Sequence, residues 1–209
     1  MTEEQSLYGF NQETPEQLGS APIAPGIRDN IKLVDVEYGP AKEGSSNMRL
    51  AFHFEDSDGK TLSHTEWPID IEETKQRATK QGDDPNTAVQ KRFRAQGVRI
   101  KHIVTKVIPA ENAAVPKVNS FQQYAQAVIN LLKPHLPAGP FRLKVILNNK
   151  DYSSLPPYTP FIEKQTDKPT ELRIDKNERI APKKSAQSGS LDMPDMDGAP
   201  PISDDDVPF

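Results

Sequence analysis

Two segments near the start of the chain alternate apolar and polar residues, as half-buried strands do. Residues 31–38 (IKLVDVEY) place Val34, Val36 and Tyr38 on one face and stop at a Gly-Pro pair. Residues 48–55 (MRLAFHFE) alternate over their whole length. One face of the second segment holds Met48, Leu50, Phe52 and Phe54, and the other holds Arg49, Ala51, His53 and Glu55. The pattern predicts two strands of an antiparallel sheet with one buried face.

A β-hairpin is predicted where Asp58-Gly59 separates residues 48–55 from the segment TLSHTEWPI. This dipeptide favours a two-residue type I′ turn, because that turn needs positive φ at both central positions. In that register the facing pairs are Leu50 with Trp67, Met48 with Ile69, and His53 with His64. The hairpin therefore predicts that Trp67 points into the core.

Residues 71–135 are predicted to form a helical insertion. Asp84 followed by Pro85 is typical of a helix start, with an N-cap and then proline at the first helical position. Apolar residues then recur at helical spacing up to Pro109, namely Val89, Phe93, Ile100, Ile103, Val104 and Val107. Gly97 lies on the same stripe and indicates a kink or close packing. A second helix is predicted from Ser120 as N-cap.

Two further strands are predicted, at residues 141–147 (FRLKVIL) and 170–175 (TELRID). The order of three strands, helices and two strands matches a five-stranded OB-fold barrel, mainly β with a helical insertion. A small α+β sandwich is the alternative. We expect a flexible arm at residues 1–27, the OB-fold domain at 28–180, a flexible linker at 181–202 and an acidic tip at 203–209.

The composition argues against catalysis and against a membrane span. The chain has no cysteine, which excludes disulfides and zinc–thiolate sites. It has no phosphate-binding glycine loop and no metalloprotease or hydrolase motif. No apolar run approaches the ~20 residues of a transmembrane helix, and the N-terminus lacks a signal-peptide pattern. We therefore expect a cytoplasmic protein without enzymatic activity, metal or cofactor, and interpret His53 and His64 as polar cross-strand neighbours.

Positive charge is concentrated in the middle of a chain whose net charge is −4. Residues 71–150 carry 14 Lys/Arg against 5 Asp/Glu, whereas residues 191–209 carry 6 Asp/Glu and no Lys/Arg. This asymmetry favours a polyanion site. The candidate phosphate contacts are Lys91, Arg92, Arg94, Arg99, Lys101, Arg142 and Lys144. The alternative interpretation is a solvated helix face.

Binding of single strands without sequence preference also needs aromatic side chains on which bases can stack. Tyr152 and Tyr158, in the loop after residues 141–147, are the favoured candidates. Phe161 and Trp67 are further ones, although the hairpin register favours the core for Trp67. The alternative is that this loop packs onto the barrel.

The sequence SDDDVPF at residues 203–209 resembles the C-terminal tip of bacterial and phage single-stranded-DNA-binding proteins. The family tip is a run of aspartates, an aliphatic residue, Pro and Phe, and here these places hold Asp204, Asp205, Asp206, Val207, Pro208 and Phe209. The resemblance implies docking on replication and recombination proteins such as a polymerase, helicase, primase or exonuclease. The long arm and large helical insertion make a phage-type member the expectation, within a bacterial host cell.

These observations predict an OB-fold protein that coats single-stranded DNA in replication, recombination and repair and recruits partners through its tip. The alternative is an adaptor or inhibitor that mimics such a tip without binding DNA. The sequence leaves the site size, the preference between DNA and RNA, and the oligomeric state open, a homo-oligomer included.

Overall fold

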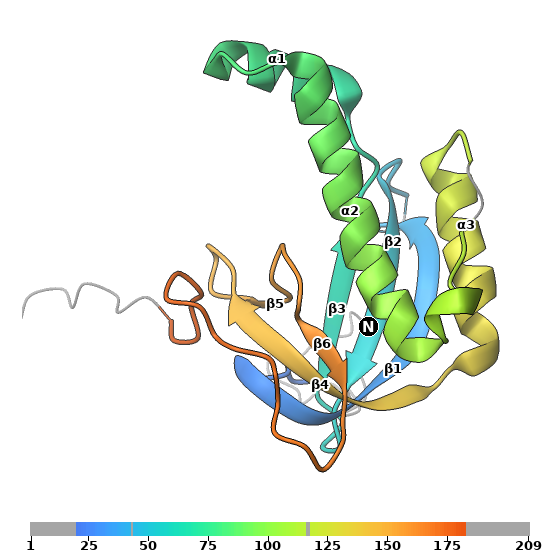
Figure 1. Cartoon of the computed structure of the whole chain (residues 1–209), viewed down its shortest axis with the longest axis vertical. Helices are drawn as coiled ribbons and strands as arrows, with labels where there is room; N and C mark the ends of the chain where they lie inside the picture. Colours follow the sequence, from blue (N-terminus) through green and yellow to red (C-terminus); the bar gives the residue numbers. More distant parts are fainter. Residues whose placement is uncertain (1–19, 43, 116–117, 183–209) are drawn as a thin grey trace, which may run out of the picture.

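The chain folds into a small barrel of strands with three helices inserted between its third and fourth strands (Figure 1). This computed structural model describes residues 20–42, 44–115 and 118–182. The strands are β1 (Gly26–Pro40), β2 (Met48–Glu55), β3 (Thr61–Glu66), β4 (Ala138–Leu147), β5 (Ser153–Ser154) and β6 (Ile162–Lys164). The helices are α1 (Ile71–Gln81), α2 (Pro85–Val107) and α3 (Phe121–Leu132), with short 3₁₀ turns at Ala110–Asn112 and Lys133–His135.

The strands form a nearly closed antiparallel barrel of the OB type. Their order is β3-β2-β1-β4-β5, and β6 also pairs with β4. The long β1 pairs with both β2 and β4, and β3 approaches β5 to complete the circuit. The predicted OB-like barrel with a helical insertion is therefore confirmed, and the alternative α+β sandwich is not formed.

The barrel interior is filled by the alternating positions that the sequence indicated. Phe52 and Phe54 of β2 and Phe141 and Leu143 of β4 are buried. Two helices close the barrel, since α3 packs against β1 and α2 against β6. Their buried residues are Ile100, Ile103 and Val104 of α2 and Ala125, Val128, Ile129 and Leu132 of α3.

The predicted hairpin forms, but its register is one residue away from the prediction. Gly59 has a φ of +76°, whereas Asp58 has no positive φ, so the connection is longer than a type I′ turn. Asp56 and Lys60 close the loop, with Asp56 N donating to Lys60 O at 3.0 Å. Leu50 consequently faces Glu66 in place of Trp67. Because side chains alternate, this shift buries Glu66 and turns Trp67 outward.

Three further features of the fold differ from the prediction: the end of the N-terminal arm, the inward face of β1 and the last strand. Ile23 is buried and bonds through its N–H to Thr61 O at 3.0 Å, so the last residues of the predicted 1–27 arm belong to the folded domain. A β-bulge in β1 makes Val34 an extra residue, and Ile31, Leu33 and Val36 face inward. The segment 170–175 forms no strand, and the last strand is β6.

The helix starts follow the predicted capping. Asp84 Oδ2 accepts from Thr87 N at 2.7 Å, and Ser120 Oγ accepts from Gln123 N at 3.2 Å. Helix α1 has no apolar stripe and was predicted only as part of the insertion. Together with the first turns of α2, it projects beyond the barrel (Figure 1). Phe93, predicted as a core residue, is therefore exposed.

Candidate nucleic-acid interface

Helix α2 carries most of the predicted phosphate contacts. It contains six Lys/Arg residues and no Asp or Glu. Four of its cations are exposed, namely Lys91, Arg92, Arg94 and Lys101. Arg92 also donates from Nη1 to Thr74 Oγ1 of α1 at 3.3 Å. These four side chains remain available to a polyanion.

Arg99 of α2 is instead held by the barrel. Its Nε and Nη2 donate to the two carboxylate oxygens of Glu66 at 2.6 and 2.7 Å. Burial by itself would raise the pKa of Glu66, but hydrogen bonds from Arg99 and His64 lower it to about 2. Hydrogen bonding to Glu66 raises the pKa of Arg99. The bidentate pair fastens α2 to the end of β3, so Arg99, predicted as a phosphate contact, is paired with a carboxylate in this structure.

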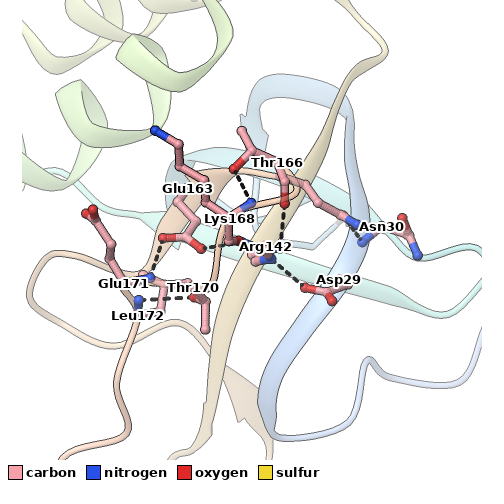
Figure 2. Close-up of polar contacts among 10 residues, drawn as sticks. Asp29, Asn30, Arg142, Glu163, Thr166, Lys168, Thr170, Glu171 and Leu172 are labelled. Carbon is pink, nitrogen blue, oxygen red and sulfur yellow. Dashed lines mark hydrogen bonds and ion pairs between the residues drawn. The ribbon is translucent and has the colours of Figure 1, made fainter.

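Arg142 of β4 is enclosed by four oxygen atoms (Figure 2). Its guanidinium contacts Asp29 Oδ1 at 3.1 Å and Glu163 Oε1 at 3.3 Å. It also donates to the carbonyls of Thr166 and Lys168, both at 2.7 Å. These four hydrogen bonds tie β1, β6 and the loop after β6 together, so Arg142, predicted as a phosphate contact, is engaged by the fold in this structure.

Lys144 of β4 points out of the barrel, as predicted, but it is only 2% exposed. Its Nζ lies 2.8 Å from Glu178 Oε1 and 3.7 Å from Asp175 Oδ2, and donates to Arg173 O at 3.0 Å. It also lies 5.5 Å from the centroid of the Tyr158 ring. The chain after β6 thus covers Lys144, which cannot reach DNA in this structure.

Besides Phe93 of α2, three aromatic side chains of the described residues lie on the surface. Tyr152 is 66% exposed, and Tyr158 and Trp67 are each 45% exposed. The two tyrosines were predicted as stacking residues, and their exposure is consistent with that role. Trp67 was also a candidate, but the predicted hairpin register assigned it to the core. The fourth candidate, Phe161, is fully buried and belongs to the core.

Arg99 connects the chain positions that carry two of these rings. It binds Glu66, the neighbour of Trp67, and donates from Nη1 to the carbonyl of Pro157, the neighbour of Tyr158, at 3.3 Å. Gln96 Nε2 donates to Trp67 O at 2.7 Å and so fixes the backbone at the indole. The ion pair therefore serves as a scaffold that holds both aromatic positions in place.

A hollow of 330 Å³ lies beside Trp67. Its walls include Arg92 and Gln96 of α2, the Glu66–Arg99 pair, and the acidic residues Asp70 and Glu73. Arg92 is thus the exposed cation that the structure brings to the same hollow as an exposed aromatic ring. Lys101 lines a separate hollow with Gly97 and Tyr124.

The histidines do not meet as the predicted register required. His53 Nδ1 lies 2.9 Å from Ser63 Oγ, and His64 Nε2 lies 3.1 Å from Glu66 Oε1. His102 accepts from the backbone N–H of Phe161 at 3.3 Å, and burial with the nearby charge of Lys106 lowers its pKa to about 4. Within residues 20–42, 44–115 and 118–182, no group of three or more His, Asp or Glu side chains is placed to hold a metal ion.

The predicted partner-binding residues Asp204, Asp205, Asp206, Val207, Pro208 and Phe209 lie outside the described residues, as do most of the predicted arm and linker. For the described part of the chain, no helix has both the length and the apolar character needed to cross a bilayer. Comparison of the chain with models of protein families, with curated proteins and with solved structures gave no match.

Proposed function

We propose that this protein binds single-stranded DNA without strong sequence preference, coats it during replication, recombination and repair, and is not an enzyme. The observation that carries the proposal is the hollow that the exposed residues Trp67 and Arg92 both line. A base can stack on the indole while the guanidinium contacts a neighbouring phosphate. Because every base has a stacking face, such a site discriminates little between sequences.

The rest of the surface supports the same function. Lys91, Arg94 and Lys101 extend the positive charge along α2, and Tyr152 and Tyr158 offer two further rings. The OB-like barrel is an architecture that binds oligonucleotides, which supports the proposal by analogy only.

The test is fluorescence anisotropy of a labelled oligo-dT strand, titrated with protein at several salt concentrations. We expect tight binding that weakens steeply as salt rises, because each phosphate contact releases counterions. A double-stranded oligonucleotide of the same length serves as the control and should bind more weakly. Absence of oligo-dT binding would refute the proposal and favour the adaptor that acts without DNA.

We further propose that Asp204–Phe209 recruits replication and recombination proteins and competes with DNA for the cations of α2. The segment combines three aspartates with an apolar Val-Pro-Phe sequence, which suits a basic partner surface with an apolar pocket. A chain that ends at Ser190 lacks six aspartates and should bind oligo-dT more tightly than the full chain at low salt. Equal affinity would refute the competition but not the DNA binding.

A further inference from the structure

An apolar cleft of 590 Å³ lies between α2, α3 and the segment that joins β3 to α1. The inference about what occupies this cleft does not depend on the proposed DNA-binding function. Its lining is largely apolar and includes Ile69, Ile71, Phe93, Gly97, Phe121 and Tyr124. Phe93 and Ile71 are 49% and 42% exposed, so their side chains still face water there. A concave apolar surface that includes large exposed side chains is typical of a binding site.

Gly97 makes room in this cleft. It lies on the apolar stripe of α2, but α2 continues through it, and a Cβ at this position would meet no atom within 4 Å. The predicted kink or close packing is therefore absent. The glycine costs helix stability and leaves open space where a larger side chain would fill the cleft.

One apolar cluster of the chain outside the described residues lies within reach of this cleft. Residues 7–10 (LYGF) supply Leu7, Tyr8 and Phe10 within a stretch of mostly polar residues. The described chain starts at Ser20, whose Oγ lies 2.6 Å from Thr61 Oγ1 at the beginning of β3. The other end of β3 leads directly into the cleft wall. The six residues of β3 span roughly 20 Å, whereas the ten residues from Phe10 to Ser20 can span about 33 Å.

Charge favours the same pairing. Residues 1–19 contain four Glu and no Lys or Arg. Helix α2, which forms one wall of the cleft, contains six Lys/Arg and no acid. None of these cations lines the cleft itself, so they attract an acidic segment to the helix, and the apolar residues of that segment match the cleft lining. Because the cleft is apolar, the chain from Phe10 to Ser20 is long enough to reach it, and the acidic segment is attracted to α2, we propose that Leu7–Phe10 docks in the cleft of its own chain.

Disulfide trapping tests this proposal, because the chain has no cysteine of its own. The variant Asn11→Cys/Asn119→Cys places one thiol beside Phe10 and one on an exposed residue of the cleft wall. Under mild oxidation we expect an intramolecular disulfide to form about tenfold faster than in Ser203→Cys/Asn119→Cys, because docking raises the local thiol concentration. Adding Gly97→Leu, which fills the cleft, should remove that advantage, whereas Gly97→Ala should retain it.

Each other outcome overturns the proposal. Faster trapping of the Ser203 variant would assign the cleft to the acidic tip, and disulfide-linked dimers would assign it to a second copy of the chain. Equal rates in both variants, or trapping that Gly97→Leu leaves unchanged, would show that Leu7–Phe10 does not occupy the cleft. Thermal melts verify that the Gly97 variants fold. Since trapping is measured without DNA, none of these results bears on the proposed DNA binding.

Discussion

The cations of β4 and those of α2 look alike in the sequence and have different environments in the structure. Arg142 and Lys144 alternate with apolar residues on a strand, and Arg92 and Lys101 lie among apolar residues on a helix. Of these four side chains, only Arg92 and Lys101 on the helix are exposed. The two strand cations are enclosed by carboxylates and carbonyls of segments far away in the chain.

The difference lies in the partners. Helix α2 has no acidic residue of its own, and among the residues that the structure describes only its Arg99 pairs with a carboxylate, that of Glu66. The β4 cations meet Asp29, Glu163 and Glu178, which come from β1, β6 and the final segment. Buried pairs of this kind hold the fold together, whereas exposed cations outside such pairs are available for a ligand. The variants below test this division, from the largest expected effect to the smallest.

Replacing Lys144 should produce the largest loss of stability. In Lys144→Met the buried carboxylate of Glu178 loses its ammonium partner, and breaking a buried pair in this way costs about 3–5 kcal/mol. Urea unfolding measures the change. Lys101→Met, on the exposed face of α2, is the matched control and should alter the free energy of unfolding by no more than about 0.5 kcal/mol. Similar losses in both variants would contradict the division.

Acid should remove the contribution of Glu66 to stability. Its folded-state pKa is about 2, below the ordinary 4.5, so the unfolded chain takes up the proton first as the pH falls. The contribution is complete above about pH 4.5 and is lost as the pH falls toward 2. Urea unfolding of the wild type and of Glu66→Gln should therefore show a stability difference that shrinks across this interval. A difference independent of pH would contradict the assigned pKa.

Removal of the exposed indole should weaken DNA binding without unfolding the protein. Trp67→Ala is expected to cost about 1–3 kcal/mol in affinity for oligo-dT, the typical value of one base stacked on an aromatic side chain. Anisotropy titrations measure this change. Phe93→Ala removes another exposed ring of similar exposure that lines the apolar cleft, and it should leave the affinity unchanged. Equal losses would show that general surface hydrophobicity drives binding.

The smallest expected effect is the loss of one phosphate contact. Arg92→Ala should reduce the slope of log affinity against log salt concentration by about 1, and change the free energy of unfolding by no more than about 0.5 kcal/mol. Arg77→Ala on α1 removes an exposed cation that pairs with Glu73, and it serves as the control. If both variants leave the slope unchanged, Arg92 makes no phosphate contact.

Local patterns predicted much of the fold. Alternation in residues 48–55 and 141–147 correctly identified the buried faces of β2 and β4. The caps at Asp84 and Ser120 marked the helix starts, because capping depends on residues within one turn. The order of elements then indicated the barrel.

The errors arose where the outcome depends on a turn or on distant residues. The loop between Asp56 and Lys60 contains one residue more than the predicted turn. This extra residue shifts the register by one, so Glu66 lies on the inner face where Trp67 was predicted. The carboxylate partners of Arg142 and Lys144 were not foreseen, because they come from remote segments that no local pattern reveals. The same register error assigned Trp67 to the core, whereas its exposed side chain is now the basis of the proposed function.

The fluorescence of Trp67, the only tryptophan of the chain, tests the central claim most directly. Unlabelled oligo-dT should change the emission of Trp67 in a saturable manner, with a midpoint that moves to higher concentration as salt is added. Anisotropy of the labelled strand, measured in parallel, should give the same midpoint. Binding seen by anisotropy without any change at Trp67 would contradict the account and place the DNA on another face of the barrel.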